Sequence, residues 1–211
     1  MKKCMILAVF LWFVCHANSI YSQKVFIGSV GAYNSTNVQS NIDEAPTQFL
    51  HSFSGGINLE YRGNDWLSFY AEVNYNERGF TFKDDYYYPR QKTPAYVNFY
   101  YWSYPVGFVV RTNKRFYVFC GLGFDPSVMV SIVDMWPSST SQTWGVAGIP
   151  TFDFGEYIEP GIGFKLNKRV IIKASARARY SFTTVTNVNY NPGYSIQNYG
   201  FGAQLGISYG L

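Results

Sequence analysis

The sequence has few charged residues, few histidines and few cysteines. Asp, Glu, Lys and Arg make up 14% of the 211 residues, against about a quarter in an average soluble domain. The two histidines and three cysteines do not form the clustered spacing of a zinc site. The net charge of +4 is small, and the basic residues are scattered. We therefore predict no metal, no cofactor and no nucleic-acid partner.

Long apolar runs are absent except at the start, where residues 5–14 form one after a pair of lysines. Small residues follow, and this order is typical of a secretory signal peptide. The run is shorter than the roughly 20 apolar residues of a membrane-spanning helix. We predict a signal peptide over 1–22, cleaved near Ser19 or Ser22, and one exported domain over 23–211. That domain keeps a single cysteine, so no internal disulfide can form in it.

Aromatic residues and glycines are abundant, with 19 Tyr, 18 Phe and 19 Gly. Between Asn198 and Leu211 every second residue is apolar or aromatic, and those between are small or polar. Successive side chains of a strand point to opposite faces, so this stretch is predicted to be a strand with one apolar and one polar face. The pattern recurs at about 49–62, 67–76, 95–111, 116–132, 152–166 and 170–183. A strand at about 24–34 is also predicted, with ambiguous facing.

The connections between these strands alternate in length. Those after the second, fourth and sixth strands are short turns, and those at about 35–48, 83–94, 134–150 and 187–195 are long. Transmembrane barrels have short periplasmic turns and long extracellular loops, whereas a Greek-key sandwich has no reason to sort its connections in this way. We predict an all-β fold, an eight-stranded antiparallel up-and-down transmembrane β-barrel in the bacterial outer membrane.

Two local features depart from regular strands. The alternation slips by one residue near Glu77 to Gly79, which suggests a β-bulge. Three prolines, Pro105, Pro126 and Pro160, fall inside predicted strands. A closed barrel has no free edge on which to place them, so each is expected to mark a bulge or a missing ladder hydrogen bond.

Charged side chains of the strands fall on the polar series, which faces the lumen of a barrel. Eight strands enclose an interior just wide enough for side chains to fill. Glycines 200, 202 and 206 on the last strand are expected to leave room for long cations beside them. Because unpaired buried charges are costly, we predict a salt-bridged plug, with a binding or proton-conducting role as the alternative. Its predicted members are Glu60, Glu72, Glu159, Lys173, Arg177 and Arg179.

Two further groups are candidate functional residues. His51 is the only histidine of the exported domain, but it falls on the apolar series while Ser52 and Ser54 fall on the other. A serine nucleophile needs a base oriented by a third group, so a membrane-interface histidine is favoured over a catalytic one. Aromatic residues in the long connections are candidates for contacts with a ligand or protein, or else for packing of the loops on themselves; they are Tyr87, Trp136, Trp144 and Tyr190.

Several stretches resemble the PorT-like outer-membrane β-barrel family. They are the exported leader, Tyr104-Pro105-Val106 before a short basic turn, the glycine-rich strand near 116–132, Phe154-Gly155, residues 177–180 and the alternating C-terminus. The resemblance covers about residues 24–211 and is mostly architectural. The family usually ends in an aromatic residue, whereas this chain ends in Leu211 with Tyr209 two residues before. The resemblance implies an outer-membrane barrel with no catalytic residues to carry over, and its named member is implicated in protein secretion.

The predicted function is that of a non-enzymatic outer-membrane barrel with a side-chain-plugged lumen. It would act through its extracellular loops or its periplasmic face, in adhesion, envelope integrity or support of protein secretion. A narrow pore for small solutes and a lipid-modifying outer-membrane hydrolase are the two alternatives. The expected partners are outer-membrane lipid, the barrel-assembly machinery and an envelope or secretion protein.

Overall fold

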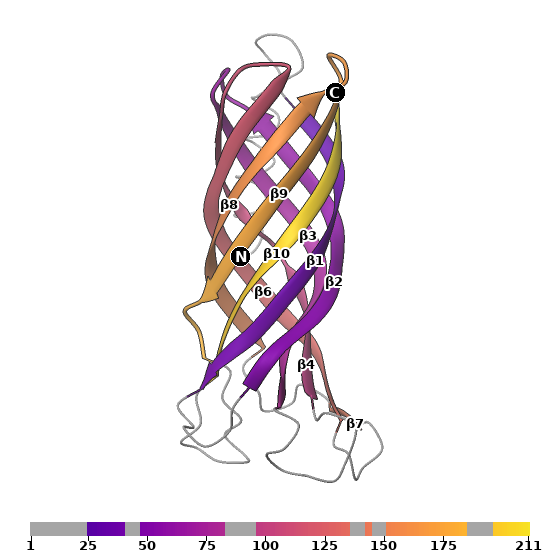
Figure 1. Cartoon of the computed structure of the whole chain (residues 1–211), viewed down its shortest axis with the longest axis vertical. Helices are drawn as coiled ribbons and strands as arrows, with labels where there is room; N and C mark the ends of the chain where they lie inside the picture. Colours follow the sequence, from indigo (N-terminus) through magenta and orange to yellow (C-terminus); the bar gives the residue numbers. More distant parts are fainter. Residues whose placement is uncertain (1–24, 41–46, 83–95, 136–141, 145–150, 185–195) are drawn as a thin grey trace, which may run out of the picture.

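The computed structural model describes residues 25–40, 47–82, 96–135, 142–144, 151–184 and 196–211. Tilted strands form a tall cylinder, with the short turns and the C-terminus at one end (Figure 1). No helix among these residues is long and apolar enough to cross a membrane. The strands are β1 (Val25–Ser40), β2 (Thr47–Arg62), β3 (Leu67–Phe82), β4 (Tyr96–Ser103), β5 (Val106–Arg111), β6 (Phe116–Met135), β7 (Gln142–Trp144), β8 (Phe152–Lys165), β9 (Val170–Ser181) and β10 (Ile196–Gly210).

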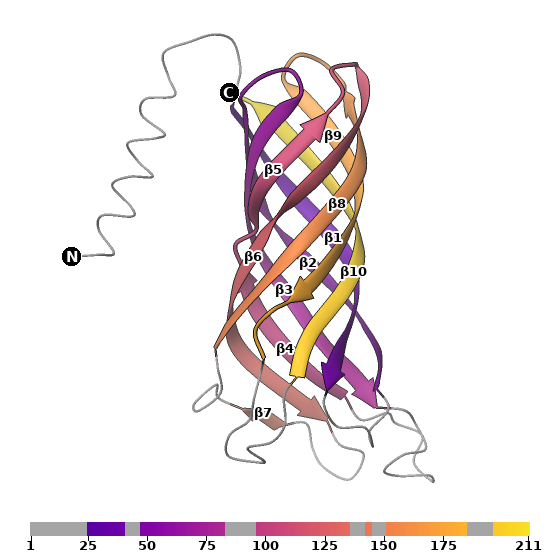
Figure 2. The same ribbon diagram turned by 90° about the vertical axis from the view of Figure 1, so that its left-hand side faces the viewer.

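The sheet closes on itself through its first and last strands. β1 pairs antiparallel with β10 from Phe26↔Gly210 to Ser40↔Ile196, and it pairs with β2 on its other side. β4 and β5 both lie between β3 and β6, so they share one position in the wall. The ring therefore has eight positions, and the predicted eight-stranded antiparallel barrel is confirmed (Figure 2). β7 lies off this ring and pairs only with the end of β6.

Several predicted strand bounds differ from the structure. The predicted strand 67–76 continues to Phe82 as β3, and the predicted strand 95–111 is divided into β4 and β5. The first strand does not end near Asn34 but continues to Ser40, because the mostly polar residues 35–40 still pair with β10. The short strand β7 lies within the predicted loop 134–150. Polar composition at a strand end therefore marks the end of the lipid-facing surface in this chain, and the ladder continues beyond it. The predicted signal peptide lies outside the described residues.

The three prolines each coincide with an irregularity of the ladder. Pro105 lies in the break between β4 and β5, and this break faces Asp125 and Pro126 on β6. Two hydrogen bonds keep the wall joined there: the Tyr104 amide donates to the Pro126 carbonyl at 2.8 Å, and the Glu72 amide donates to the Pro105 carbonyl at 2.9 Å. Around Pro160, the β8–β9 ladder lacks the pairs between Ile158↔Ala178 and Gly161↔Ser175. Prolines thus interrupt pairing without opening the barrel.

The outer wall is apolar and the interior is polar over most of the barrel. Phe201, Leu205 and Ile207 on β10 are each more than half exposed on the outside. The facing of β1, ambiguous in the sequence, is settled: Phe26 is buried in the lumen and Ile27 is exposed on the wall. A continuous apolar exterior of this kind requires lipid around it.

The β-bulge predicted near Glu77 to Gly79 is confirmed in the pairing of β2 with β3. The register shifts between Phe49 and Ser54, opposite this stretch, while β3 keeps its facing. Arg78 and Phe80 are both buried inside, on the same series as Glu72. The lumen becomes apolar toward the long-loop end, where Phe80 points inward. The Glu77 carboxylate accepts hydrogen bonds from Asn98 Nδ2 and Tyr100 Oη of β4.

Candidate functional site

The most highly organised group of polar side chains lies in the lumen, in three successive layers of ion pairs. The layer nearest the short turns is centred on Glu60 of β2, which is 1% exposed. Its carboxylate accepts hydrogen bonds from Arg62 Nε at 2.9 Å and Arg111 Nη1 at 3.1 Å. Its other oxygen accepts one from Lys173 Nζ of β9. One carboxylate therefore joins β2, β5 and β9.

The middle layer is a carboxylate–guanidinium–carboxylate bridge. Arg177 Nη2 on β9 lies 2.9 Å from Glu72 Oε2 on β3 and 2.6 Å from Glu159 Oε2 on β8. The second oxygen of Glu159 accepts from Ser175 Oγ at 2.7 Å. Tyr70 donates its hydroxyl to Glu72. Both carboxylates are thus satisfied by more than the shared arginine.

The layer toward the long loops is a four-residue ring. Arg78 donates to Asp125 at 2.9 Å and to Asp153 at 3.0 Å. Arg179 donates to the same two carboxylates at 2.6 Å and 3.0 Å. Ser103 and Ser127 complete the donors and acceptors around Arg78. Each aspartate therefore accepts from two guanidinium groups, which is the arrangement that makes buried charge tolerable.

Apolar clusters occupy the lumen at both ends of this ladder. Phe26, Tyr70, Tyr117, Phe119, Val109 and Ile171 pack together near the short turns. Val38, Phe80, Phe99, Tyr101, Met129 and Ile132 pack together toward the long loops. Side chains therefore obstruct the lumen at several levels along its length. The sequence indicated a polar lumen throughout and predicted neither cluster.

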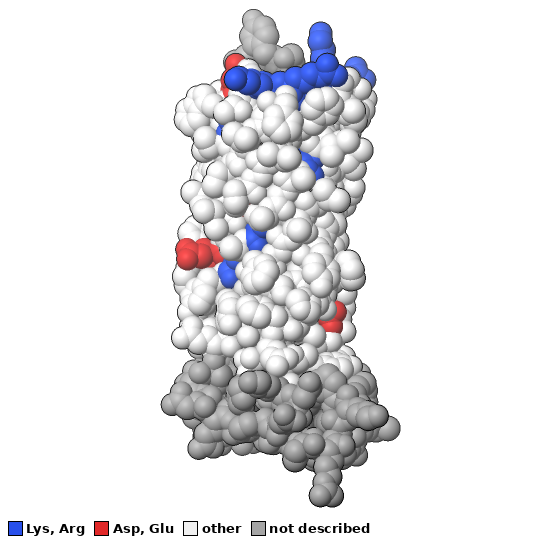
Figure 3. All heavy atoms as spheres, in the orientation of Figure 1, with Lys and Arg blue, Asp and Glu red and all other residues white. Residues whose placement is uncertain are grey.

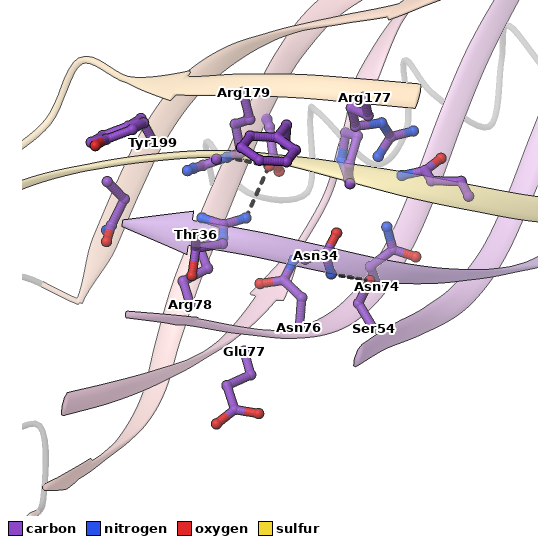
Figure 4. A pocket seen from close by; sticks show the side chains of 17 residues that line it. Asn34, Thr36, Ser54, Asn74, Asn76, Glu77, Arg78, Arg177, Arg179 and Tyr199 are labelled. Carbon is purple, nitrogen blue, oxygen red and sulfur yellow. Dashed lines mark hydrogen bonds and ion pairs between the residues drawn. The ribbon is translucent and has the colours of Figure 1, made fainter. Parts of the chain in front are cut away.

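One polar cavity of about 60 Å³ lies beside the ion pairs. It is lined by Asn34, Ser54 and Asn74 on one side and by Arg177 and Arg179 on the other (Figure 4). The Asn34 amide donates to Ser54 Oγ at 2.9 Å. A cavity of this size and polarity has room for a few ordered waters.

The glycines of β10 lie opposite the cations of β9, as the sequence indicated. The reason that these positions lack a side chain differs from the predicted one. Gly202 pairs with Arg177 and Gly206 with Lys173. The nearest atoms that a Cβ at Gly202 would meet belong to β1, with Asn34 Oδ1 at 2.4 Å. These glycines therefore accommodate β1 and open the cavity rather than making space for the arginines themselves.

The structure places all six predicted lumen residues in ion pairs: Glu60, Glu72, Glu159, Lys173, Arg177 and Arg179. Sequence reasoning missed five further members of the network. Four of them lie on polar series that could be traced by alternation alone: Arg62, Arg111, Asp125 and Asp153. Arg78 was hidden because the change in lumen polarity near it was interpreted as a slip.

His51 is exposed on the outer wall, and it meets a serine that the sequence did not suggest. Its Nδ1 lies 3.1 Å from Ser35 Oγ on β1, and its ring stacks on Tyr33. Ser52 points inward, as predicted, and donates to the Glu77 carbonyl. No carboxylate contacts His51 among the residues that the structure describes, and Ser35 is only 5% exposed. The pair lacks the orienting acid and the open approach of a nucleophilic site.

The aromatic residues of the long connections are mostly outside the described residues. Tyr87, Trp136 and Tyr190 are among these, and their predicted contact role stays a prediction. Trp144 ends β7, with its Cα opposite that of Ile132. In the described parts of the chain, no group of His, Cys, Asp or Glu could hold a metal ion.

Comparison with known proteins supports the fold. Neisserial surface protein A is 14% identical, with 87% of this chain and 96% of that chain covered and a TM-score of 0.50. OprG from Pseudomonas aeruginosa is 10% identical, with 90% and 97% covered and a TM-score of 0.56. No curated protein matches the sequence. The model of the outer membrane protein beta-barrel domain matches residues 5–208, and the chain therefore belongs to that family.

Proposed function

We propose that this chain is a non-enzymatic outer-membrane barrel with a closed lumen, acting through surfaces at its two ends. The observation that carries the proposal is the stack of three buried ion-pair layers between two apolar clusters. A solute passing through would have to separate Arg177 from Glu72 and Glu159. It would then have to break the ion pairs of Arg78 and Arg179 with Asp125 and Asp153. Breaking one such buried pair costs about 3–5 kcal/mol, and the layers lie in series.

The closed lumen is tested by conductance in planar bilayers. Purified wild-type barrel is expected to show no large steady conductance. A matched variant that removes only the middle layer, Glu72→Ala with Glu159→Ala and Arg177→Ala, is also expected to stay closed, because the other two layers and both apolar clusters remain in series with it. Large steady conductance of the wild type would refute the proposal.

A narrow pore is the second candidate, and the polar cavity beside Arg177 favours it. Waters there could connect the middle and loop-side layers. If the barrel is a narrow pore, the wild type should show a small conductance. Asn34→Leu fills the cavity with apolar atoms and should abolish that conductance. If the lumen is closed, Asn34→Leu should change only the stability of the barrel.

The surfaces through which the closed barrel acts are its long loops and its periplasmic face. Adhesion, envelope integrity and support of protein secretion are the roles that fit such a scaffold. The PorT-like subgroup, suggested by Tyr104-Pro105-Val106 and the C-terminal pattern, supports a secretion role and a protein partner in the envelope. Cross-linking of intact envelopes, followed by a pull-down with and without residues 136–141, tests for that partner. Recovery of no protein beyond the assembly machinery would count against it.

A further inference from the structure

Exposed cations gather at the short-turn end of the barrel (Figure 3). Lys114 and Arg115 lie on the β5–β6 turn, and Lys168 and Arg169 lie on the β8–β9 turn; all four are exposed. Asp65 is the only exposed acidic side chain among the described residues at this end. The closed-lumen function makes no use of this charge.

Each of the two turns holds its arginine against an aromatic side chain of the outer wall. The guanidinium carbon of Arg115 lies 5.2 Å from the centre of the Phe164 ring on β8. Arg169 Nη1 donates to Tyr209 Oη on β10 at 3.0 Å. Phe164 and Tyr209 are 37% and 45% exposed on the apolar, lipid-facing series. Both guanidinium groups are therefore held beside the wall, where the lipid lies.

The pairing of β6 with β8 fixes the turn that carries Arg115. Lys165, next to Phe164 in β8, belongs to the opposite face of the strand, and its Nζ lies 5.9 Å from the centre of the buried Tyr117 ring. The Lys165 amide donates to the Arg115 carbonyl at 2.9 Å. Lys165 Nζ donates to Asn113 Oδ1 at 2.9 Å. The backbone of Arg115 is thus tied to β8, which holds the β5–β6 turn beside Phe164.

The height of the two arginines matches the phosphate level of a bilayer. Short turns of outer-membrane barrels lie on the periplasmic side, and the apolar band begins beside them. Here the lipid-facing pair Phe116↔Phe164 follows directly after Arg115. A guanidinium group at that boundary meets lipid headgroups, and its planar fork suits the oxygens of a phosphate.

We propose that Arg115 and Arg169, supported by Lys114 and Lys168, bind the phosphates of anionic phospholipids in the periplasmic leaflet. The occupant is assigned as lipid because the aromatic contacts hold the guanidinium groups at the side of the barrel. An acidic protein docking from the periplasm would meet the end of the turns instead. The site goes beyond the closed-lumen function, and conductance does not depend on it.

The test is native mass spectrometry of the folded full-length barrel, titrated with phosphatidylglycerol or with phosphatidylcholine. The wild type is expected to retain phosphatidylglycerol more strongly, and less so at high salt. Arg115→Gln with Arg169→Gln is expected to reduce phosphatidylglycerol binding about fivefold per charge removed, with phosphatidylcholine binding unchanged. The heat-dependent gel shift of each variant verifies that it is folded.

Two control variants separate positioning from net charge. Asp65→Asn changes one exposed charge at the same end, and it is expected to keep or increase phosphatidylglycerol binding. Phe164→Leu keeps every cation but removes the ring beneath Arg115, and it is expected to lower the preference. Equal binding of the two lipids by the wild type, or full preference in the double arginine variant, would overturn the proposal. Displacement of the lipid by millimolar inorganic phosphate would overturn its assignment to a lipid.

Discussion

Arg177 on β9 and Glu72 on β3 stand on separate walls of the barrel, and their side chains meet in the lumen with Nη2 2.9 Å from Oε2. β3 and β9 are not neighbours in the sheet, so this contact ties the barrel across its interior. Lys173 and Arg179, also on β9, make comparable ties to Glu60 on β2 and Asp125 on β6. β9 therefore supplies the cations of the ion pairs that cross the lumen to β2, β3 and β6.

Replacing Arg177 with Met is expected to destabilise the barrel by about 3–5 kcal/mol, because Glu72 and Glu159 would both lose their shared cation in a buried setting. Urea unfolding in lipid vesicles, followed by tryptophan fluorescence, measures the loss. The control is Arg115→Gln on the exposed rim, expected to change stability by less than about 1 kcal/mol. Equal effects of the two variants would show that the middle layer contributes no more than a surface charge.

The Glu60–Lys173 pair is expected to be energetically coupled. Glu60→Gln leaves Lys173 and Arg111 without their carboxylate, whereas Lys173→Met leaves Glu60 with its two arginines. The double variant should therefore be more stable than the sum of the single losses indicates, by about 0.5–3 kcal/mol. A double-mutant cycle of unfolding free energies measures this term. Simple additivity would mean that the pair does not interact in the folded barrel.

The sequence predicted the barrel because strand alternation and loop length are local signals. The long C-terminal series from Tyr199 to Leu211 carried the inside–outside assignment, and the inward cations of β9 followed from it. The partners of those cations depend on which walls face one another across the lumen. That Glu72 meets Arg177, and Asp153 meets Arg78, follows from closure and register, which no single strand specifies.

The sequence was least informative where the two faces change polarity. Toward the long loops the wall extends beyond the region of apolar exterior, and the lumen is filled by Phe80 and Phe99 instead of charges. Side chains there still alternate between the inner and outer faces, but the inward residues are apolar. Arg78 was missed for this reason, and the strand was predicted to end too early near Asn34.

His51→Ala is expected to leave the lipid composition of the outer membrane unchanged. The ring contacts Ser35 and Tyr33, but the described residues supply no carboxylate to orient it, and Ser35 is buried. Comparison of extracted envelope lipids from cells with the wild type and the variant checks this, with Ser35→Ala as the matched change at the other partner. Loss of the same lipid modification in both variants would instead establish the pair as a hydrolytic site.

Gly163→Ala is expected to destabilise the barrel by about 1–3 kcal/mol through overpacking of the lumen. A Cβ at Gly163 would lie 2.1 Å from Cζ of Tyr117. That ring is 2% exposed and packs with Phe26 and Phe119, so it has no free space into which to move. Unfolding in lipid vesicles measures the change.

Gly31→Ala provides the control for this substitution. Gly31 lies on the outer wall of β1, and a Cβ there meets nothing within 4 Å. The added methyl group should leave stability unchanged or raise it slightly, because alanine has less conformational freedom than glycine in the unfolded chain. Equal stability of the two alanine variants would show that the tight contact of Gly163 with Tyr117 does not limit the packing of the lumen near the short turns.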